Sequence, residues 1–129
     1  MFDVHAHLHD EAFVGDRDAT VDRARAVGLE GIVTIGTDPE ENRRAVACAE
    51  AYPDVWVSVG LHPHFFNEAE ENTNSSTQIP NKTQSRDQKF QKEIQELRAI
   101  AESSNRVVAI GECGLDYYRR QSADSNQQE

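Results

Sequence analysis

Two histidines near the start of the chain have the spacing of metal ligands. The segment Asp3-Val4-His5-Ala6-His7 alternates polar and apolar residues. Alternate side chains of an extended strand share one face, so His5 and His7 can reach the same ion. An exposed edge strand with solvated histidines fits this segment equally well, and the segment alone leaves both interpretations open.

Glu112 directly follows the apolar segment Val107-Val108-Ala109-Ile110-Gly111. A carboxylate at the end of a buried strand is costly without a partner. In parallel α/β folds the carboxyl ends of the strands gather at the active site, so Glu112 is expected to bridge ions held by His5 and His7. Pairing of Glu112 with Arg119 or Arg120 is the second alternative.

The segment Gly60-Leu61-His62-Pro63-His64 follows another apolar run. Its histidines suit phosphate contact or proton transfer. His62 and His64 also fit a plain loop that Pro63 fixes.

The segment after Glu112 offers one acid, two aromatic residues and two cations. Tyrosine and arginine side chains can hold a phosphodiester or stack on a base, although the tyrosines fit a packing role as well. Cys113 is interpreted as a small packing residue rather than a nucleophile, because nothing in the sequence marks a lowered thiol pKa. The residues concerned are Asp116, Tyr117, Tyr118, Arg119 and Arg120.

Four strands and three helices are expected to position these groups. Short runs rich in Val and Ile, bounded by Gly, Pro or polar residues, predict strands. Helical spacing of apolar residues, together with capping residues such as Asp38 and Gly28, predicts the helices. The strands are expected at 2–8, 31–36, 55–61 and 107–112, and the helices at 16–27, 39–51 and along the stripe Phe90, Ile94, Leu97 and Ile100.

A polar segment interrupts this order. Residues 67–88 are nearly devoid of large apolar side chains and include a tract of Asn, Thr and Ser. This composition predicts an inserted disordered loop.

Alternating strands and helices predict a parallel sheet with right-handed crossovers. Once the polar insert is set aside, the strand intervals match the unit size of a β/α barrel of about 250 residues. A doubly wound sheet is the alternative, but no strand is followed by a glycine-rich phosphate loop.

Charge and cysteine content narrow the functional classes. The 129 residues include 23 acidic and 13 basic ones, for a formal charge of −10, which excludes a grip on nucleic acid through bulk basicity. Cys48 and Cys113 are too few for a disulfide scaffold and are expected to be free thiols. No apolar stretch suits a membrane span and no secretory leader pattern opens the chain, so a cytoplasmic protein is expected.

Together, the motifs resemble the three N-terminal signatures of the TatD family of metal-dependent hydrolases. They match in order and spacing, and the resemblance spans essentially the whole chain except the polar insert. The segments that carry it are Asp3-Val4-His5-Ala6-His7, Gly60-Leu61-His62-Pro63-His64 and Val108-Ala109-Ile110-Gly111-Glu112-Cys113-Gly114-Leu115-Asp116-Tyr117-Tyr118.

The resemblance implies an α/β TIM barrel of the metallo-dependent hydrolase type and a deoxyribonuclease. The implied enzyme uses two divalent ions (Mg²⁺, Mn²⁺ or Zn²⁺) and metal-activated water to cleave DNA phosphodiesters, as a 3′ to 5′ exonuclease on single strands. It makes His5 and His7 metal ligands and Glu112 a bridging, catalytic ligand. His62, His64, Asp116 and Arg119 would lie in the substrate region. The ions, helped by Arg119, would supply the positive field that the acidic chain lacks.

The family's barrel has eight strands, whereas four are predicted here. We therefore expect residues 1–129 to form a partial barrel domain, from a truncated product or a partial gene model. Its open edge strands favour self-association. Two alternatives stay open: a catalytically incompetent binding or assembly module, and a metal-dependent ester or amide hydrolase on the same fold.

Overall fold

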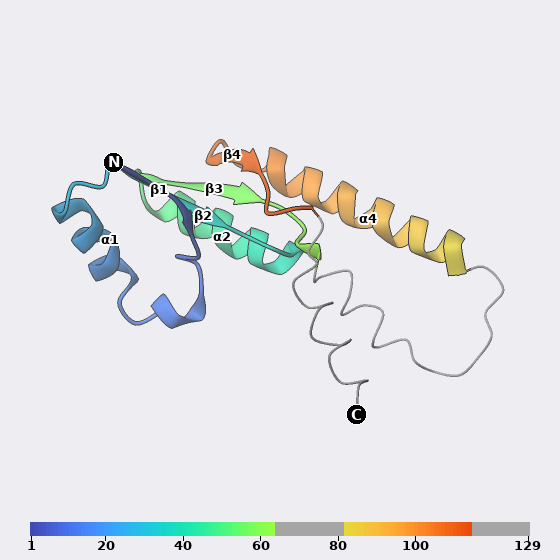
Figure 1. Ribbon diagram of the computed structural model, residues 1–129, viewed down its shortest axis with the longest axis horizontal. Coiled ribbons are helices and arrows are strands. Elements are labelled where there is room, and N and C mark those ends of the chain that lie inside the picture. Colours follow the sequence, from blue (N-terminus) through green and yellow to red (C-terminus); the bar gives the residue numbers. More distant parts are fainter. Residues whose placement is uncertain (64–81, 115–129) are drawn as a thin grey trace, which may run out of the picture.

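The computed structural model describes residues 1–63 and 82–114, with the side chains of 82–87 left out (Figure 1). Strands and helices alternate along these residues, as the sequence predicts. The elements are β1 (Phe2–Ala6), the 3-10 helix η1 (Glu11–Phe13), α1 (Arg17–Ala26), β2 (Gly31–Ile35), α2 (Pro39–Ala51), β3 (Val55–Val59), α4 (Lys82–Glu102) and β4 (Val107–Ile110).

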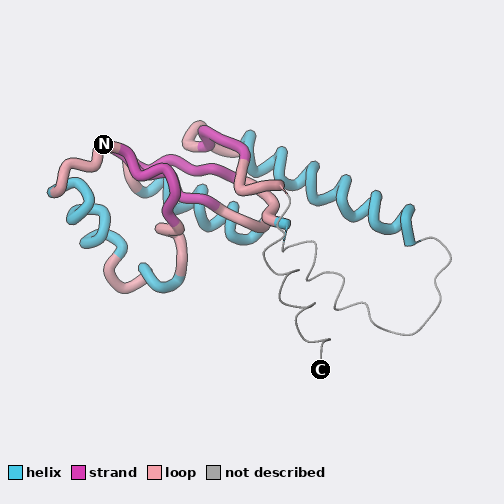
Figure 2. Tube along the Cα trace, in the orientation of Figure 1, coloured by secondary structure: helices cyan, strands magenta, loops and turns pink. Residues whose placement is uncertain are grey.

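The four strands form one parallel sheet in the order β1-β2-β3-β4 (Figure 2). Each strand ends one or two residues before its predicted limit. The residues between the observed and the predicted strand ends, which include His7 and Glu112, therefore lie in the segments that follow the strands. This placement gives them freedom to leave the pleat of the sheet.

Helix α2 coincides with its predicted range because its start is strongly specified. The Asp38 side chain accepts hydrogen bonds from the backbone N–H groups of Glu40 and Glu41, both at 2.8 Å. Pro39 occupies the first helical turn, where its missing N–H is not needed. Helix α1 begins after Asp16 and is followed by Gly28 at a φ of +90°, which favours glycine.

Helix α4 corrects one prediction, since it begins at Lys82 and so includes residues 82–88, which were assigned to a disordered loop. The sequence of this stretch is polar but rich in straight-chain Lys, Gln and Arg, which favour helices. Low apolar content does not imply low helix propensity in this stretch, which is why the predicted loop is wrong there. The remainder of the predicted insert, 67–81, lies outside the described residues.

The hydrophobic core lies between the sheet and the helices on one of its faces. Val55, Val57 and Val59 of β3 are fully buried, and α2 runs along this strand (Figure 1). Leu97 and Ile100, two residues of the predicted α4 stripe, belong to the same cluster.

Both edge strands contain a register shift. Phe2 pairs with Gly31 but Ala6 pairs with Thr34, so one extra residue lies between Asp3 and Ala6. Gly31 and Thr34 lie on opposite faces of β2, and hence so do Phe2 and Ala6, although their even spacing predicts one face. The strict alternation expected for the first strand is therefore wrong.

Strand β4 contains a similar register shift. Val107 pairs with Val57 while Ala109 pairs with Ser58, which leaves Val108 as the extra residue. Such bulges redirect the side chains that follow them. His5 lies within the irregular stretch of β1, and Glu112 follows the extra residue of β4 by four positions.

Candidate metal centre

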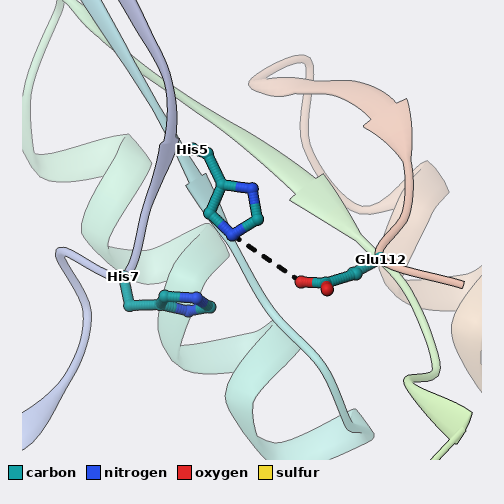
Figure 3. Close-up of side chains that lie close together, drawn as sticks. All are labelled: His5, His7 and Glu112. Atoms are coloured by element: carbon teal, nitrogen blue, oxygen red, sulfur yellow. Dashed lines mark ion pairs between the residues drawn. The ribbon is translucent and has the colours of Figure 1, made fainter. Parts of the chain in front are cut away.

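His5, His7 and Glu112 lie together at the carboxyl ends of β1 and β4 (Figure 3). One ligand atom from each residue lies within 4.8 Å of the others. Strands β1 and β4 are the two edges of the described sheet, roughly 14 Å apart if the sheet were flat. The ligand atoms nevertheless lie within 4.8 Å of one another, so the two edge strands and their side chains converge at this end of the sheet.

Glu112 directs its two carboxylate oxygens at two different histidines. Its Oε2 atom is 3.7 Å from Nε2 of His5, and its Oε1 atom is 3.7 Å from Nε2 of His62. The side chains of His5 and Glu112 are 58% and 41% exposed, whereas His62 is 22% exposed. The cluster is thus open to solvent on the side of His5 and more enclosed beside His62.

The donor set fits a divalent metal ion. Two imidazole nitrogens and one carboxylate oxygen are typical of catalytic sites that keep a coordination position for water or substrate. The rings of His5 and His7 have centroids 5.5 Å apart and lie edge to face, so each can direct a nitrogen toward a common point. The predicted grouping of these three residues is therefore present in the structure.

Arg17 fixes the turn that follows His7. Its guanidinium donates to the backbone carbonyls of Leu8 at 2.8 Å, and of His9 and Asp10 at 3.3 Å. The N–H of Asp10 donates to the carbonyl of His7 at 2.9 Å. The backbone beyond the second histidine is thus held by a side chain from α1.

His9 has a different environment from His5 and His7. It is 5% exposed, and its Nδ1 shares a hydrogen bond of 2.9 Å with the Thr34 hydroxyl. Burial lowers the pKa of His9, although the charge of Glu41 opposes this effect. His9 is therefore a buried partner of β2, and its ring also contacts that of His7 edge to face, with centroids 6.0 Å apart.

Two buried polar residues near the site were not predicted from the sequence. Ser58 is 6% exposed and donates its hydroxyl hydrogen to the carbonyl of Gly111 at 2.9 Å. Asn42 is fully buried within α2. The available signal was a lone polar residue in an apolar pattern, since Ser58 interrupts a valine-rich strand and Asn42 stands on the face of Ala45, Val46 and Ala49.

Several predicted residues lie outside the described part of the chain. These are His64, Asp116 and Arg119, together with the alternative Glu112 partner Arg120. His62, the remaining predicted substrate residue, lies beside Glu112. Cys48 and Cys113 are both free thiols, as expected, but Cys113 is exposed, which contradicts its interpretation as a packing residue.

Comparison with known proteins gives a family match along nearly the whole chain. A sequence model described as TatD related DNase matches residues 2–129. The protein named 3′-5′ ssDNA/RNA exonuclease TatD from Pantoea ananatis is 36% identical over 129 residues, which are 99% of this chain and 42% of that protein. The protein of the same name from Erwinia tasmaniensis is also 36% identical, over 99% of this chain and 41% of its own length. The chain thus spans about two fifths of the length of these curated relatives.

Solved structures give a consistent result. The crystal structure of YJJV, a TatD homologue from Escherichia coli K12, matches with a TM-score of 0.66 and 27% identity, over 95% of this chain and 42% of that one. An uncharacterized amidohydrolase from Saccharomyces cerevisiae matches with a TM-score of 0.73 and 24% identity, over 93% and 38%. The second likeness concerns the fold alone. The predicted α/β fold of the TIM-barrel metallo-dependent hydrolase type, represented by four parallel strands, is confirmed.

In the part of the chain that the structure describes, no helix has the length and apolar character needed to cross a membrane.

Proposed function

The chain belongs to the TatD related DNase family, and from this premise we propose that it carries part of the active site of a metal-dependent deoxyribonuclease. The observation that carries the proposal is the meeting of His5, His7 and Glu112 at the strand ends. Membership of this family implies the use of divalent metal. The residues present supply the ligand types for it.

The proposed substrate is DNA, cleaved from the 3′ end and in single-stranded form. Support comes from the curated relatives, which are named 3′-5′ ssDNA/RNA exonucleases. The formal charge of −10 makes bulk attraction of a polyanion unfavourable. Binding would then depend on local positive charge at the strand ends, to which Arg119 would contribute.

In this proposal His5 and His7 hold an ion through ring nitrogens, and Glu112 places one carboxylate oxygen beside them. A divalent ion bound there would supply Lewis-acid activation of the phosphoryl group and of water. His62 lies 3.7 Å from the second Glu112 oxygen, where it could hold a proton or contact a phosphate oxygen. We assign His64, Asp116 and Arg119 to the substrate region on the resemblance alone.

We propose two ions per site, of Mg²⁺, Mn²⁺ or Zn²⁺. Each Glu112 oxygen faces a different histidine, so the carboxylate can serve two neighbouring positions at once. Two ions suit the clamping of both oxygens in phosphodiester cleavage. A cytosolic location remains a prediction, in keeping with the free thiols of Cys48 and Cys113.

Metal titration of the purified chain, followed by an exonuclease assay on a 3′-labelled single strand with Mg²⁺ or Mn²⁺, tests this function. Removal of one of three ligands by His5→Ala or Glu112→Ala should abolish cleavage and weaken Mn²⁺ binding at least tenfold, because the ion loses a direct ligand. Glu102→Ala removes an exposed carboxylate at the end of α4 and should change neither result. A folded chain that binds no divalent ion would sink the proposal.

We further propose self-association through the sheet edges. Among the described residues, β1 and β4 each pair with a single strand. Both also carry exposed apolar side chains, with Val4 at 68% and Ile110 at 61% exposure. Unpaired strand edges with exposed apolar groups favour pairing with another chain.

A further inference from the structure

The Asn42 side chain makes both of its hydrogen bonds to a single residue, Gly60, just beyond β3. Its Nδ2 donates to the carbonyl of Gly60 at 2.8 Å, and its Oδ1 accepts from the N–H of Gly60 at 3.0 Å. The side chain is fully buried in the first turns of α2. This amide thus satisfies the two polar groups that Gly60 presents after the sheet ladder ends.

Gly60 in turn lies directly against the backbone that carries Glu112. A Cβ atom at residue 60 would lie 2.4 Å from the carbonyl carbon of Gly111 and 2.6 Å from the backbone nitrogen of Glu112. No side chain fits into that space. The contact is made by backbone on both sides, so a shift of Gly60 has no flexible group to absorb it.

Asn42 is also close-packed against Gly36. A Cβ atom at Gly36 would lie 2.4 Å from Oδ1 of Asn42 and 2.7 Å from its Cα. Gly36 follows β2 and is held by a hydrogen bond from its N–H to the carbonyl of Ser58 at 3.1 Å. A continuous line of close contacts therefore runs from the end of β2 through Asn42 and Gly60 to Glu112.

The segment that leads into α2 also holds His62. The N–H of His62 donates to the carbonyl of Thr37 at 2.8 Å. The N–H of Thr37 donates to Glu41 at 3.2 Å, and its hydroxyl bonds the same carboxylate. Glu41 and Asn42, adjacent residues of one helix, thus fix the segment 60–62 at both ends.

We propose that Asn42 is a positioning residue that sets where Glu112 and His62 lie relative to each other. Without its amide, both polar groups of Gly60 would be buried and unpaired, which favours displacement of the segment or entry of water. Displacement would move the Gly111–Glu112 backbone on one side and His62 on the other. The role of Glu112 as a metal ligand rests on the proposed function, whereas the mechanical coupling does not.

Amide hydrogen exchange on the metal-free chain tests the coupling by itself. Asn42→Ala should reduce protection at Gly60, His62 and Gly111 by at least tenfold beyond any change in global stability. Val46→Ala, which truncates another buried side chain of α2, is the matched control and should lower protection only in line with global stability. A loss of exchange protection confined to the Gly60 amide, with His62 and Gly111 unchanged, would overturn the proposal.

Titration with Co²⁺, followed by its visible absorption, tests the consequence for the site. Asn42→Ala should weaken Co²⁺ binding about 10- to 100-fold and alter the absorption spectrum, as loss of a supporting partner does at metal sites. Asn42→Asp keeps the acceptor for the Gly60 N–H but loses the donor to its carbonyl, so an intermediate loss is expected. Val46→Ala should bind Co²⁺ like the wild type.

The two proposals fail in different ways. Wild-type protein that binds no Co²⁺ contradicts the proposed function, and hydrogen exchange then still decides the coupling. Wild-type protein that binds Co²⁺, with folded Asn42→Ala and Asn42→Asp binding it equally well, overturns the positioning role. Should Asn42→Ala not fold, Asn42→Asp and Gly60→Ala remain: the second forces the Gly60 and Glu112 backbones apart and should weaken Co²⁺ binding at least tenfold.

Discussion

Glu112 stands between two histidines, and its backbone is held by residues that are not themselves members of the cluster. Ser58 bonds the preceding carbonyl, and Gly60 leaves the space into which that peptide unit packs. The arrangement explains how a side chain that is 41% exposed can keep a defined position. At this scale the candidate site depends on buried hydrogen bonds beneath it as well as on the residues of the cluster.

Replacement of Ser58 tests the support beneath the carboxylate. Ser58→Ala leaves the carbonyl of Gly111 without its side-chain donor at a site that is 6% exposed, and should lower the free energy of unfolding by about 1–3 kcal/mol in urea denaturation. Ser103 makes the same type of bond to the carbonyl of Ile100 but is exposed, so Ser103→Ala should have little effect. Equal effects of the two changes would contradict the assignment.

The sequence permitted prediction of the candidate cluster but not of the residues that support it. His5, His7 and Glu112 stood out because charged or imidazole groups at strand ends need partners, and the structure brings them together. The role of Asn42 could not be predicted from the sequence, because it depends on two glycines that are 6 and 18 positions away along the chain. Close approach of backbones after three separate strands leaves no local pattern.

At the scale of elements, α2 links the fold to the site. Its first turns bear Glu41 and Asn42, which hold the segment around His62, while later turns pack on β3. Its range was predictable because Asp38 and Pro39 specify the start locally. The start of α4 was not predictable, because polar helix-forming residues carry no periodic apolar signal.

Loss of the α2 cap should therefore affect stability first. Asp38→Ala removes the acceptor for two backbone N–H groups and should lower the free energy of unfolding by about 1 kcal/mol, measured by thermal or urea denaturation. Asp38→Asn retains a capping oxygen and should stay close to the wild type. An alanine variant as stable as the asparagine variant would show that the cap contributes nothing.

Helices α1 and α2 are joined by a pH-sensitive bond. The Tyr52 hydroxyl, at the C-terminal end of α2, donates to Oδ1 of Asp18 in α1, and this bond raises the pKa of Tyr52 to about 12. A raised pKa means that the folded state favours the neutral phenol. Its contribution to stability is complete below the ordinary value of 10.0 and is lost as the pH rises from there through about 12.

Urea denaturation of the wild type and Tyr52→Phe over this range measures the effect. The difference in their free energies of unfolding should be constant below pH 10 and shrink above it. In a spectrophotometric titration of the folded wild type, Tyr52 should ionise after an ordinary tyrosine, and Asp18→Asn should bring its pKa down. A difference that is independent of pH would exclude this bond as the cause.

At the scale of the molecule, the described sheet has helices on one face and two unpaired edges. Those edges combine unsatisfied backbone groups with exposed apolar side chains, namely Phe2 and Val4 on β1 and Val108 and Ile110 on β4. The repeated β/α order made this sheet predictable from periodicity and spacing. The register shifts in the edge strands were not predictable, because a bulge depends on how the strand pairs with its partner.

Charges placed on the edges should oppose association. Sedimentation velocity at increasing protein concentration should show larger species for the wild type, and a smaller fraction of them for Val4→Lys combined with Val108→Lys. Val14 and Val27 are at least as exposed but lie outside the strands, so their replacement by lysine is the control for added charge. Association that falls equally in both variants reflects net charge and contradicts pairing through the edges.

The extra residue in β1 separates the strand into two parts, and the alternation of side chains between the two faces changes from one part to the other. Phe2, at its beginning, lies with Trp56 on the same face of the sheet as His5, with ring centroids 6.1 Å apart. A strand of unbroken period cannot offer both the aromatic contact and the ligand from that face. Deletion of Val4 would therefore leave β1 without its extra residue, and one of two contacts would be lost. Either Trp56, the sole tryptophan, loses its contact with Phe2 and changes its fluorescence, or His5 turns to the other face of the sheet and metal affinity falls. One extra residue in β1 thus keeps Phe2 and His5 on the same face of the sheet.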